Sequence, residues 1–187
     1  MNEMTPLLAG RWSPRGFDRT HVVGSGQIEC MLQAARWAPS AMNRQPWAFV
    51  VGRRGDRVHE RLEGLARGLS DWALGASALV LAAYRTEGDE PDYALHDLGG
   101  AVAHMSVQAE AMGLHVRQFA GYDHEGARTA FGIDPPWTPV VMLAVGIPGP
   151  GTSPAGREPS PSASSRPGSD RRAHHDDEAG GSRGTVS

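Results

Sequence analysis

The chain has 187 residues, with 18 basic and 21 acidic side chains, and its net charge is −3. This balance argues against a nucleic-acid-binding protein, which normally carries a basic excess. Every basic side chain is an arginine. The absence of lysine excludes a Schiff-base or pyridoxal-phosphate linkage and a Walker A phosphate loop.

The composition changes abruptly at residue 149. From there on the chain has no aromatic residue, many Gly, Pro and Ser, and one aliphatic residue larger than alanine, Val186. Such a segment cannot bury enough apolar surface to offset the entropy lost on ordering. We therefore expect one folded domain over residues 1–148 and a disordered tail over 149–187.

Metal, disulfide and membrane features are absent from the sequence pattern. Cys30 is the single cysteine, which excludes a disulfide framework and a cysteine zinc site. His96 and His104 have no third ligand at metal-binding spacing, so we predict no metal. No segment reaches the length of a membrane span, and the N-terminus lacks the basic and apolar regions of a signal peptide. We expect a cytoplasmic protein with neither membrane nor nucleic acid as partner.

Hydrophobic periodicity predicts four helices and four strands after residues 1–10, which read equally as a loose arm or a first helix. The first predicted helix buries Ile28, Met31, Leu32 and Ala35 and stops before Pro39. The longest, over 93–112, carries one apolar stripe and several small residues that would admit another backbone. The remaining helices are expected over 56–67 and 124–131, and the strands over 47–51, 78–83, 116–123 and 140–146.

The loop between the first helix and the first strand carries three neutral hydrogen-bonding side chains, Ser40, Asn43 and Gln45, bracketed by Pro39 and Pro46. Loops held at both ends by regular elements commonly present binding groups. An ordinary connection, in which Ser and Asn satisfy backbone groups, explains the same residues.

Upstream, Arg11, Ser13 and Arg15 place two guanidinium groups and a hydroxyl within five residues. Planar guanidinium groups suit phosphate oxygens, and the serine adds a neutral donor. A solvated basic turn is the alternative interpretation.

These two segments, RWSPRGFD from Arg11 and APSAMNRQPW ending at Trp47, resemble the nitroreductase family of FMN-dependent oxidoreductases. The resemblance covers residues 10–148. It implies an α+β fold in which helices flank a central, mainly antiparallel sheet, and a homodimer that packs through the helix over 93–112. It also implies one FMN at each edge of the subunit interface.

The resemblance assigns roles to individual residues. Arg11, Ser13 and Arg15 of one subunit would hold the FMN phosphate and ribityl chain. Pro39, Ser40 and Asn43 would come from the other subunit, and Gln45 would either support the loop or contact the flavin ring. Ala120 and Gly121 match a turn whose backbone approaches flavin N5, although a left-handed glycine after a strand explains the same letters.

The resemblance predicts an enzyme in which NAD(P)H delivers hydride to flavin N5 and a nitroaromatic, quinone, enone or flavin then takes the electrons. No catalytic side chain is required for this ping-pong scheme. The chain after Pro148 shows nothing that aligns with the family's usual C-terminal phosphate-binding segment. A weakly flavin-binding or non-catalytic homologue, and an oxidase that uses oxygen, are therefore the alternatives.

Overall fold

The computed structural model describes residues 4–86 and 91–154, which belong to one unit of the chain, Met1–Gly156. The tail predicted for 149–187 lies outside the described residues from 155 on. Within the described residues, no helix combines the length and the apolar character needed to cross a membrane.

Four strands form one antiparallel sheet in the order β1-β2-β4-β3. Its central strands, β2 (Ala78–Arg85) and β4 (Trp137–Gly146), are flanked by β1 (Trp47–Arg53) and β3 (His115–Phe119). The predicted α+β class with a mainly antiparallel sheet is confirmed.

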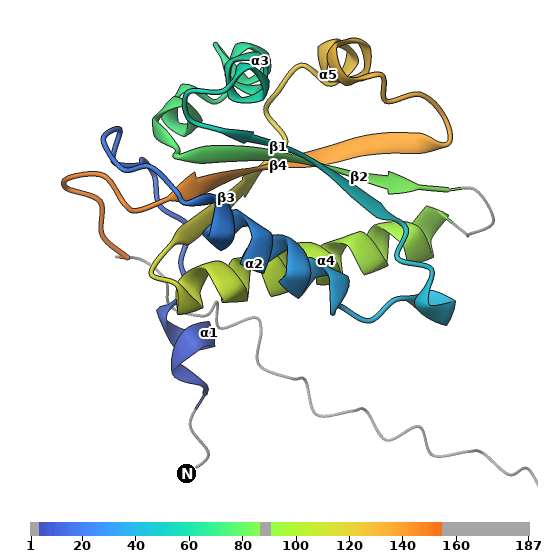
Figure 1. Ribbon diagram of the computed structural model, residues 1–187, viewed down its shortest axis with the longest axis horizontal. Coiled ribbons are helices and arrows are strands. Elements are labelled where there is room, and N and C mark those ends of the chain that lie inside the picture. Colours follow the sequence, from blue (N-terminus) through green and yellow to red (C-terminus); the bar gives the residue numbers. More distant parts are fainter. Residues whose placement is uncertain (1–3, 87–90, 155–187) are drawn as a thin grey trace, which may run out of the picture. The chain divides into compact units, whose positions relative to one another are not determined.

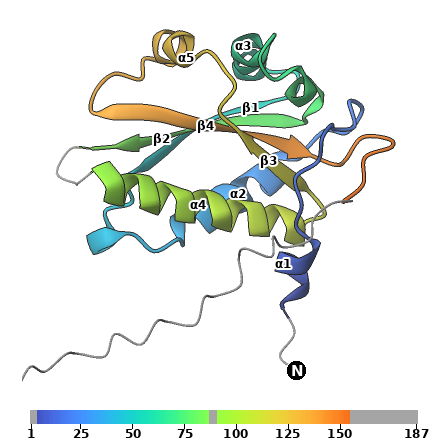
Figure 2. The ribbon, with the colours of Figure 1, turned by 180° about the vertical axis from the view of Figure 1, so that it is seen from behind.

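Helices cover both faces of the sheet (Figure 1). One face packs against α2 (Ser25–Arg36) and α4 (Pro91–Ala111), and the other packs against α3 (Arg57–Ala66) and α5 (His124–Phe131). The view from behind shows α4 lying along the sheet, with the short α1 (Pro6–Gly10) at its C-terminal end (Figure 2).

Alternation along β2 explains why both faces need a cover. Ala78, Val80 and Ala82 belong to the core cluster under α2 and α4. Leu79, Leu81 and Ala83 belong to the cluster under α3 and α5. Successive strand side chains point to opposite faces, so an uninterrupted apolar strand requires helices on both sides.

All eight predicted elements are present, with shifted ends. The strand predicted for 116–123 ends at Phe119, and the strand predicted for 140–146 begins at Trp137. The short helices α1, η1 (Ala41–Asn43) and η2 (Asp71–Gly75) were not assigned from the sequence, because three to five residues carry too little periodicity.

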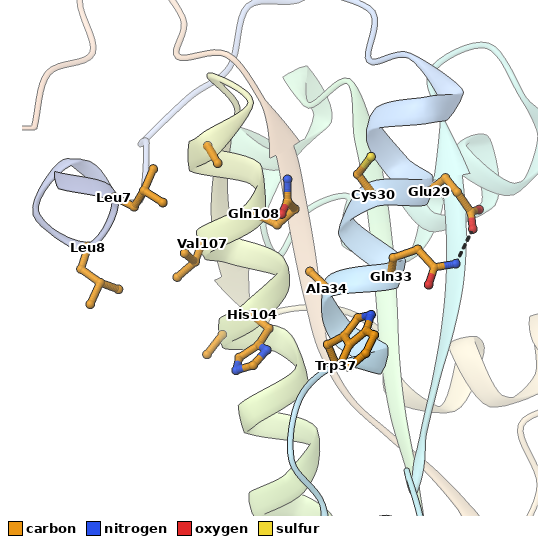
Figure 3. A pocket seen from close by; sticks show the side chains of 12 residues that line it. Leu7, Leu8, Glu29, Cys30, Gln33, Ala34, Trp37, His104, Val107 and Gln108 are labelled. Carbon is orange, nitrogen blue, oxygen red and sulfur yellow. Dashed lines mark hydrogen bonds between the residues drawn. The ribbon is translucent and has the colours of Figure 1, made fainter. Parts of the chain in front are cut away.

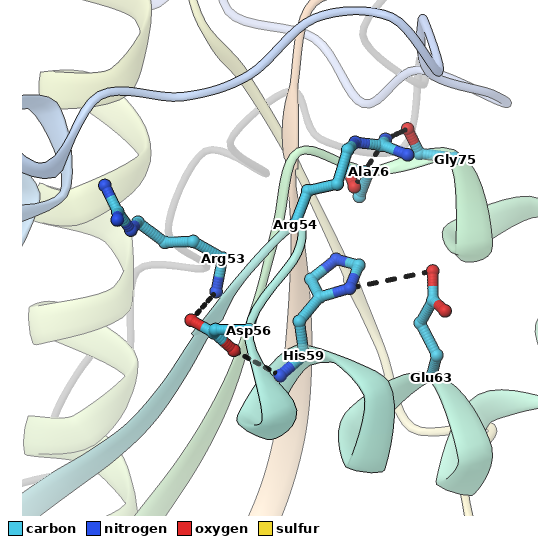
Figure 4. A network of polar contacts seen from close by, with 7 residues as sticks. All are labelled: Arg53, Arg54, Asp56, His59, Glu63, Gly75 and Ala76. Carbon is cyan, nitrogen blue, oxygen red and sulfur yellow. Dashed lines mark hydrogen bonds and ion pairs between the residues drawn. The ribbon is translucent and has the colours of Figure 1, made fainter.

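Polar contacts tie the start of α3 to the sheet (Figure 4). The Asp56 side chain caps the helix by accepting from the backbone N–H of His59 at 2.7 Å, and it also accepts from that of Arg53 at 2.8 Å. Arg54 Nη2 donates to the carbonyls of Gly75 and Ala76 at 2.6 and 2.9 Å. Burial lowers the pKa of His59, so this imidazole is neutral at pH 7.

Gly52 permits the close approach of α3 to β1, because a Cβ at this position would overlap the backbone of His59. Gly52→Ala is expected to lower the free energy of unfolding by about 2 kcal/mol or more, since helix or strand must shift. The measurement is chemical denaturation. Gly64→Ala is the control, because Gly64 lies within α3 and no atom is near its added Cβ. This change is expected to raise the free energy of unfolding by up to about 1 kcal/mol. Equal effects of the two changes would contradict the assigned packing.

Candidate functional site

The loop from Pro39 to Pro46 lies at the N-terminal end of α4, where the backbone N–H of Ala41 donates to Asp97 Oδ2 at 2.9 Å. Within the loop, Ser40 Oγ accepts from the backbone N–H of Gln45 at 3.0 Å, and Gln45 Nε2 lies 3.4 Å from Asn43 Oδ1. Pro39 and Asn43 are exposed, whereas Ser40 and Gln45 are half-buried. The structure thus gathers these four predicted residues in one surface loop.

The backbone of this loop adopts an unusual shape. Met42, Asn43 and Gln45 have φ values of 54°, 55° and 49°. Non-glycine residues seldom occupy this left-handed region, and such positions are concentrated at functional sites. The turn also leaves Met42 85% exposed.

The segment from Arg11 to Phe17 lies beside the other end of α4. The Trp12 ring is 5.3 Å from the His115 ring at the start of β3, and Arg117 Nη1 donates to the carbonyl of Pro14 at 3.2 Å. Ser13 and Arg15 are exposed, and Arg11 Nη1 lies 3.5 Å from Ser13 Oγ. The three predicted residues therefore share one segment, in which Ser13 and Arg15 are exposed and Arg11 is half-buried.

The chain after β4 returns to this segment. Asp18 donates its backbone N–H to the carbonyl of Ile147 at 3.0 Å, and Gly149 donates to that of Gly16 at 3.1 Å. Beyond this ladder, a polar hollow of about 260 Å³ is lined by Arg15, Gly151, Thr152 and Ser153. Its hydroxyl groups were not identified from the sequence, where they fall within the predicted tail.

Ala120 and Gly121 follow β3 in an exposed turn that packs tightly against the residues before η2. A Cβ on Gly121 would lie 2.8 Å from Ser70 Oγ. The neighbouring Tyr122 is buried, and burial raises the pKa of its hydroxyl to about 12, so the phenol stays protonated. The turn therefore offers backbone groups and no ionised side chain at this position.

Trp72 joins this turn to the arginine segment. Its ring lies 5.1 Å from that of Phe119 and 6.5 Å from that of Phe17, and the Arg117 guanidinium stands 4.2 Å from the Trp72 ring centre. Sequence patterns did not identify Trp72 or Arg117, because the contacts that place them join distant parts of the chain.

The two main groups of predicted residues are not brought together within one chain. Asp97 marks the loop end of α4, and Ala111 marks the end near the arginine segment. Fourteen helical residues separate these positions by about 21 Å. Figures 1 and 2 show the same separation, with the short helix of the loop at one end of α4 and α1 at the other.

Between these ends, an open groove of about 790 Å³ runs along α1, α2 and α4 (Figure 3). Leu7 and Leu8 line one side of it, and Ala34 and Trp37 line the other. Trp37 is 83% exposed. An exposed indole and exposed leucines that line the same open groove are typical of a surface that meets another molecule.

A model of the nitroreductase family matches residues 8–69 and 53–147. The chain belongs to the nitroreductase family. An uncharacterized 15.4 kDa protein in the ask 5′ region of Mycolicibacterium smegmatis is 34% identical over 108 residues, which cover 52% of this chain and 73% of that protein.

Solved structures share the fold. An oxidoreductase containing FMN is 29% identical, with 79% of this chain and 78% of that chain covered and a TM-score of 0.72. The enone reductase CLA-ER of gut-bacterial fatty acid saturation is 22% identical, with 87% and 95% covered and a TM-score of 0.74. The latter likeness supports the fold only.

Family membership gives the two exposed segments a common interpretation. The loop carries the family-like sequence, is held by a buried carboxylate and presents amide side chains. The arginine segment adjoins a polar hollow at the other end of α4. The loop and the arginine segment can bind one ligand together only if a second chain brings the loop of one subunit next to the arginine segment of the other.

Proposed function

We infer that this chain is an FMN-dependent oxidoreductase that passes hydride from NAD(P)H through flavin N5 to a small organic acceptor by a ping-pong mechanism. The observation that carries the inference is the placement of two family-like segments, both exposed, at opposite ends of α4. Family membership and the likeness to an oxidoreductase containing FMN support it.

The residues present fit FMN. Arg15, Thr152 and Ser153 line a polar hollow, and an arginine beside hydroxyl groups suits a phosphate. We propose that Arg11, Ser13 and Arg15 hold the phosphate and ribityl chain. Pro39, Ser40, Asn43 and Gln45 would line the ring, with the Ala120–Gly121 backbone near its N5.

A homodimer would complete each site. The 21 residues of α4 span about 31 Å. If two copies of α4 pack antiparallel about a two-fold axis, the arginine segment of one subunit lies next to the loop of the other. Burial of the groove that contains Leu7, Leu8 and Trp37 would stabilise such a pairing.

Bound flavin would supply the redox chemistry, so the protein's task is to bind and orient. A donor N–H in the Ala120–Gly121 turn would orient the ring near N5 without adding a titrating group. Guanidinium groups would neutralise the phosphate. We assign no acid or base side chain to the reaction.

The direct test of the function is the purified protein itself. We expect a yellow protein whose visible absorbance bleaches when NADH or NADPH is added without oxygen and returns when an acceptor is added. Mass spectrometry of the denatured sample should identify FMN. A colourless protein that does not take up added FMN would instead support a non-catalytic homologue, and slow bleaching with rapid reoxidation by oxygen would favour an oxidase.

The role of the arginine segment is tested by Arg11→Ala combined with Arg15→Ala. Loss of two charge-assisted contacts should weaken FMN binding at least about 100-fold while the dimer stays folded. Arg57→Ala with Arg61→Ala, two exposed arginines on α3, is the matched control and should leave FMN affinity unchanged. Flavin fluorescence titration measures both, and retention of FMN by the first pair would remove the assigned role.

The shared site is tested by mixing subunits. One chain carries Arg11→Ala and Arg15→Ala, and the other carries Asn43→Ala and Gln45→Ala. Neither homodimer should retain FMN, but the mixed dimer should retain one FMN per two chains. One of its sites combines the unmutated loop of the first chain with the unmutated arginine segment of the second chain. Two differently tagged chains and an FMN count per dimer give the result. An empty mixed dimer would mean that each site lies within one subunit.

A further inference from the structure

The loop from Pro39 to Pro46 needs a fixed support, because its shape is not one that its residues favour. Met42, Asn43 and Gln45 are all left-handed, and none is glycine. Residues forced into this region persist only where surrounding contacts determine the conformation. The internal Ser40–Gln45 hydrogen bond closes the loop on itself but does not attach it to the rest of the fold.

The carbonyl of Pro46, where the loop ends, accepts the backbone N–H of Arg85 at 2.9 Å, and α4 holds the middle of the loop. Asp97 Oδ2 accepts the backbone N–H of Ala41 at 2.9 Å, and these residues lie 56 positions apart in sequence. Asp97 is only 7% exposed, and its other carboxylate oxygen lies 3.4 Å from His96 Nδ1. A hydrogen bond with an ionised acceptor is shorter and stronger than a neutral one.

The position of Asp97 within α4 is otherwise suited to an apolar residue. Its neighbours on the helix, Ala94, Leu98 and Ala101, are all buried. A carboxylate placed there loses water and is stabilised only by the hydrogen bonds that it makes. Asp97 therefore contributes to the fold through the loop that it holds, and not through packing.

We propose that Asp97 is the positioning residue of the site: its buried carboxylate fixes Ala41 and so holds Ser40, Asn43 and Gln45 in the geometry that binds the ligand. Asp97 does not itself touch the ligand. That the ligand is FMN rests on the function proposed above. The hydrogen bond from Ala41 to Asp97 is a property of the protein without any ligand.

The test compares three variants at two measurements. Asp97→Ala removes the acceptor, Asp97→Asn keeps an amide oxygen in its place, and Ser106→Ala is the control. Ser106 is also buried on α4, at 4% exposure, but its hydroxyl donates to the Val102 carbonyl within the helix at 2.8 Å. The measurements are hydrogen–deuterium exchange of peptide 38–46 without ligand, and FMN affinity by fluorescence titration.

Asp97→Ala should raise exchange of the loop at least tenfold and weaken FMN binding at least tenfold. Asp97→Asn should stay within about threefold of the unmodified protein in both measurements, and Ser106→Ala should change neither. Equal effects of Asp97→Ala and Ser106→Ala, or unchanged loop exchange in Asp97→Ala, would overturn the proposal. If the unmodified protein does not bind FMN, the proposed function fails, and the exchange rates still decide the role of Asp97.

A second variant removes the donor instead, in case the Asp97→Ala chain does not fold. Ala41→Pro has no N–H to donate. Its ring Cδ takes the place of the hydrogen that Asp97 Oδ2 accepts, so the change also displaces the carboxylate, while Ser40 already has ψ 153°, the extended geometry that a residue before proline adopts. Ala41→Pro should raise loop exchange as Asp97→Ala does. Unaltered exchange would again overturn the proposal.

Discussion

The packing of α4 on the sheet is the interaction on which the rest of the structure depends. Leu98, Val102, Met105 and Ala109 bury one stripe of the helix in the core under β2 and β4. The helix thereby fixes the positions of both parts of the proposed site. Near its start Asp97 holds the loop, and just beyond its end His115 contacts the arginine segment through Trp12.

The same geometry is the reason for proposing that the site is shared between two chains. A straight helix keeps its two ends apart by a distance set by its length. If the two segments bind one ligand, as proposed above, they would meet through a two-fold axis, which an antiparallel pair of α4 helices allows. The small exposed residues of α4, among them Gly99 and Ala103, permit a close approach.

The helices and strands could be predicted from the sequence, but the contacts between residues far apart in the chain could not. Apolar alternation and 3.6-residue periodicity are local properties, so the helices and strands could be predicted. The contacts of Asp97 with Ala41 and of Trp72 with Phe17 join residues far apart, and no local pattern encodes them. The left-handed turn was equally hidden, because the residues that adopt it, Met42, Asn43 and Gln45, include no glycine.

Residues 147–153 show a second limit of reasoning from composition. Ile147 packs against the core, but the residues from 149 on offer little apolar surface, and composition therefore places the end of the folded domain at residue 148. The backbone continues to pair, through Asp18 with Ile147 and Gly149 with Gly16, and this pairing brings Thr152 beside Arg15. Composition describes side chains only, whereas these hydrogen bonds join main-chain groups, so a domain end predicted from composition does not take them into account.

The energetics of the loop explain why a buried charge and an unusual backbone occur together. Three left-handed non-glycine residues disfavour the loop by about 3 kcal/mol or more, at 1–3 kcal/mol each. One hydrogen bond to a carboxylate contributes about 1.5–3 kcal/mol, and the Ser40–Gln45 bond adds about 1 kcal/mol. The hydrogen bond to Asp97 therefore acts together with the backbone bonds from Asn43 to Ser40 and from Arg44 to Ala41 to keep the loop in this shape. A chain selected for stability alone would gain by placing glycine at the left-handed positions and an apolar residue at 97. The function proposed above accounts for the amide side chains in the loop and the carboxyl group beneath it.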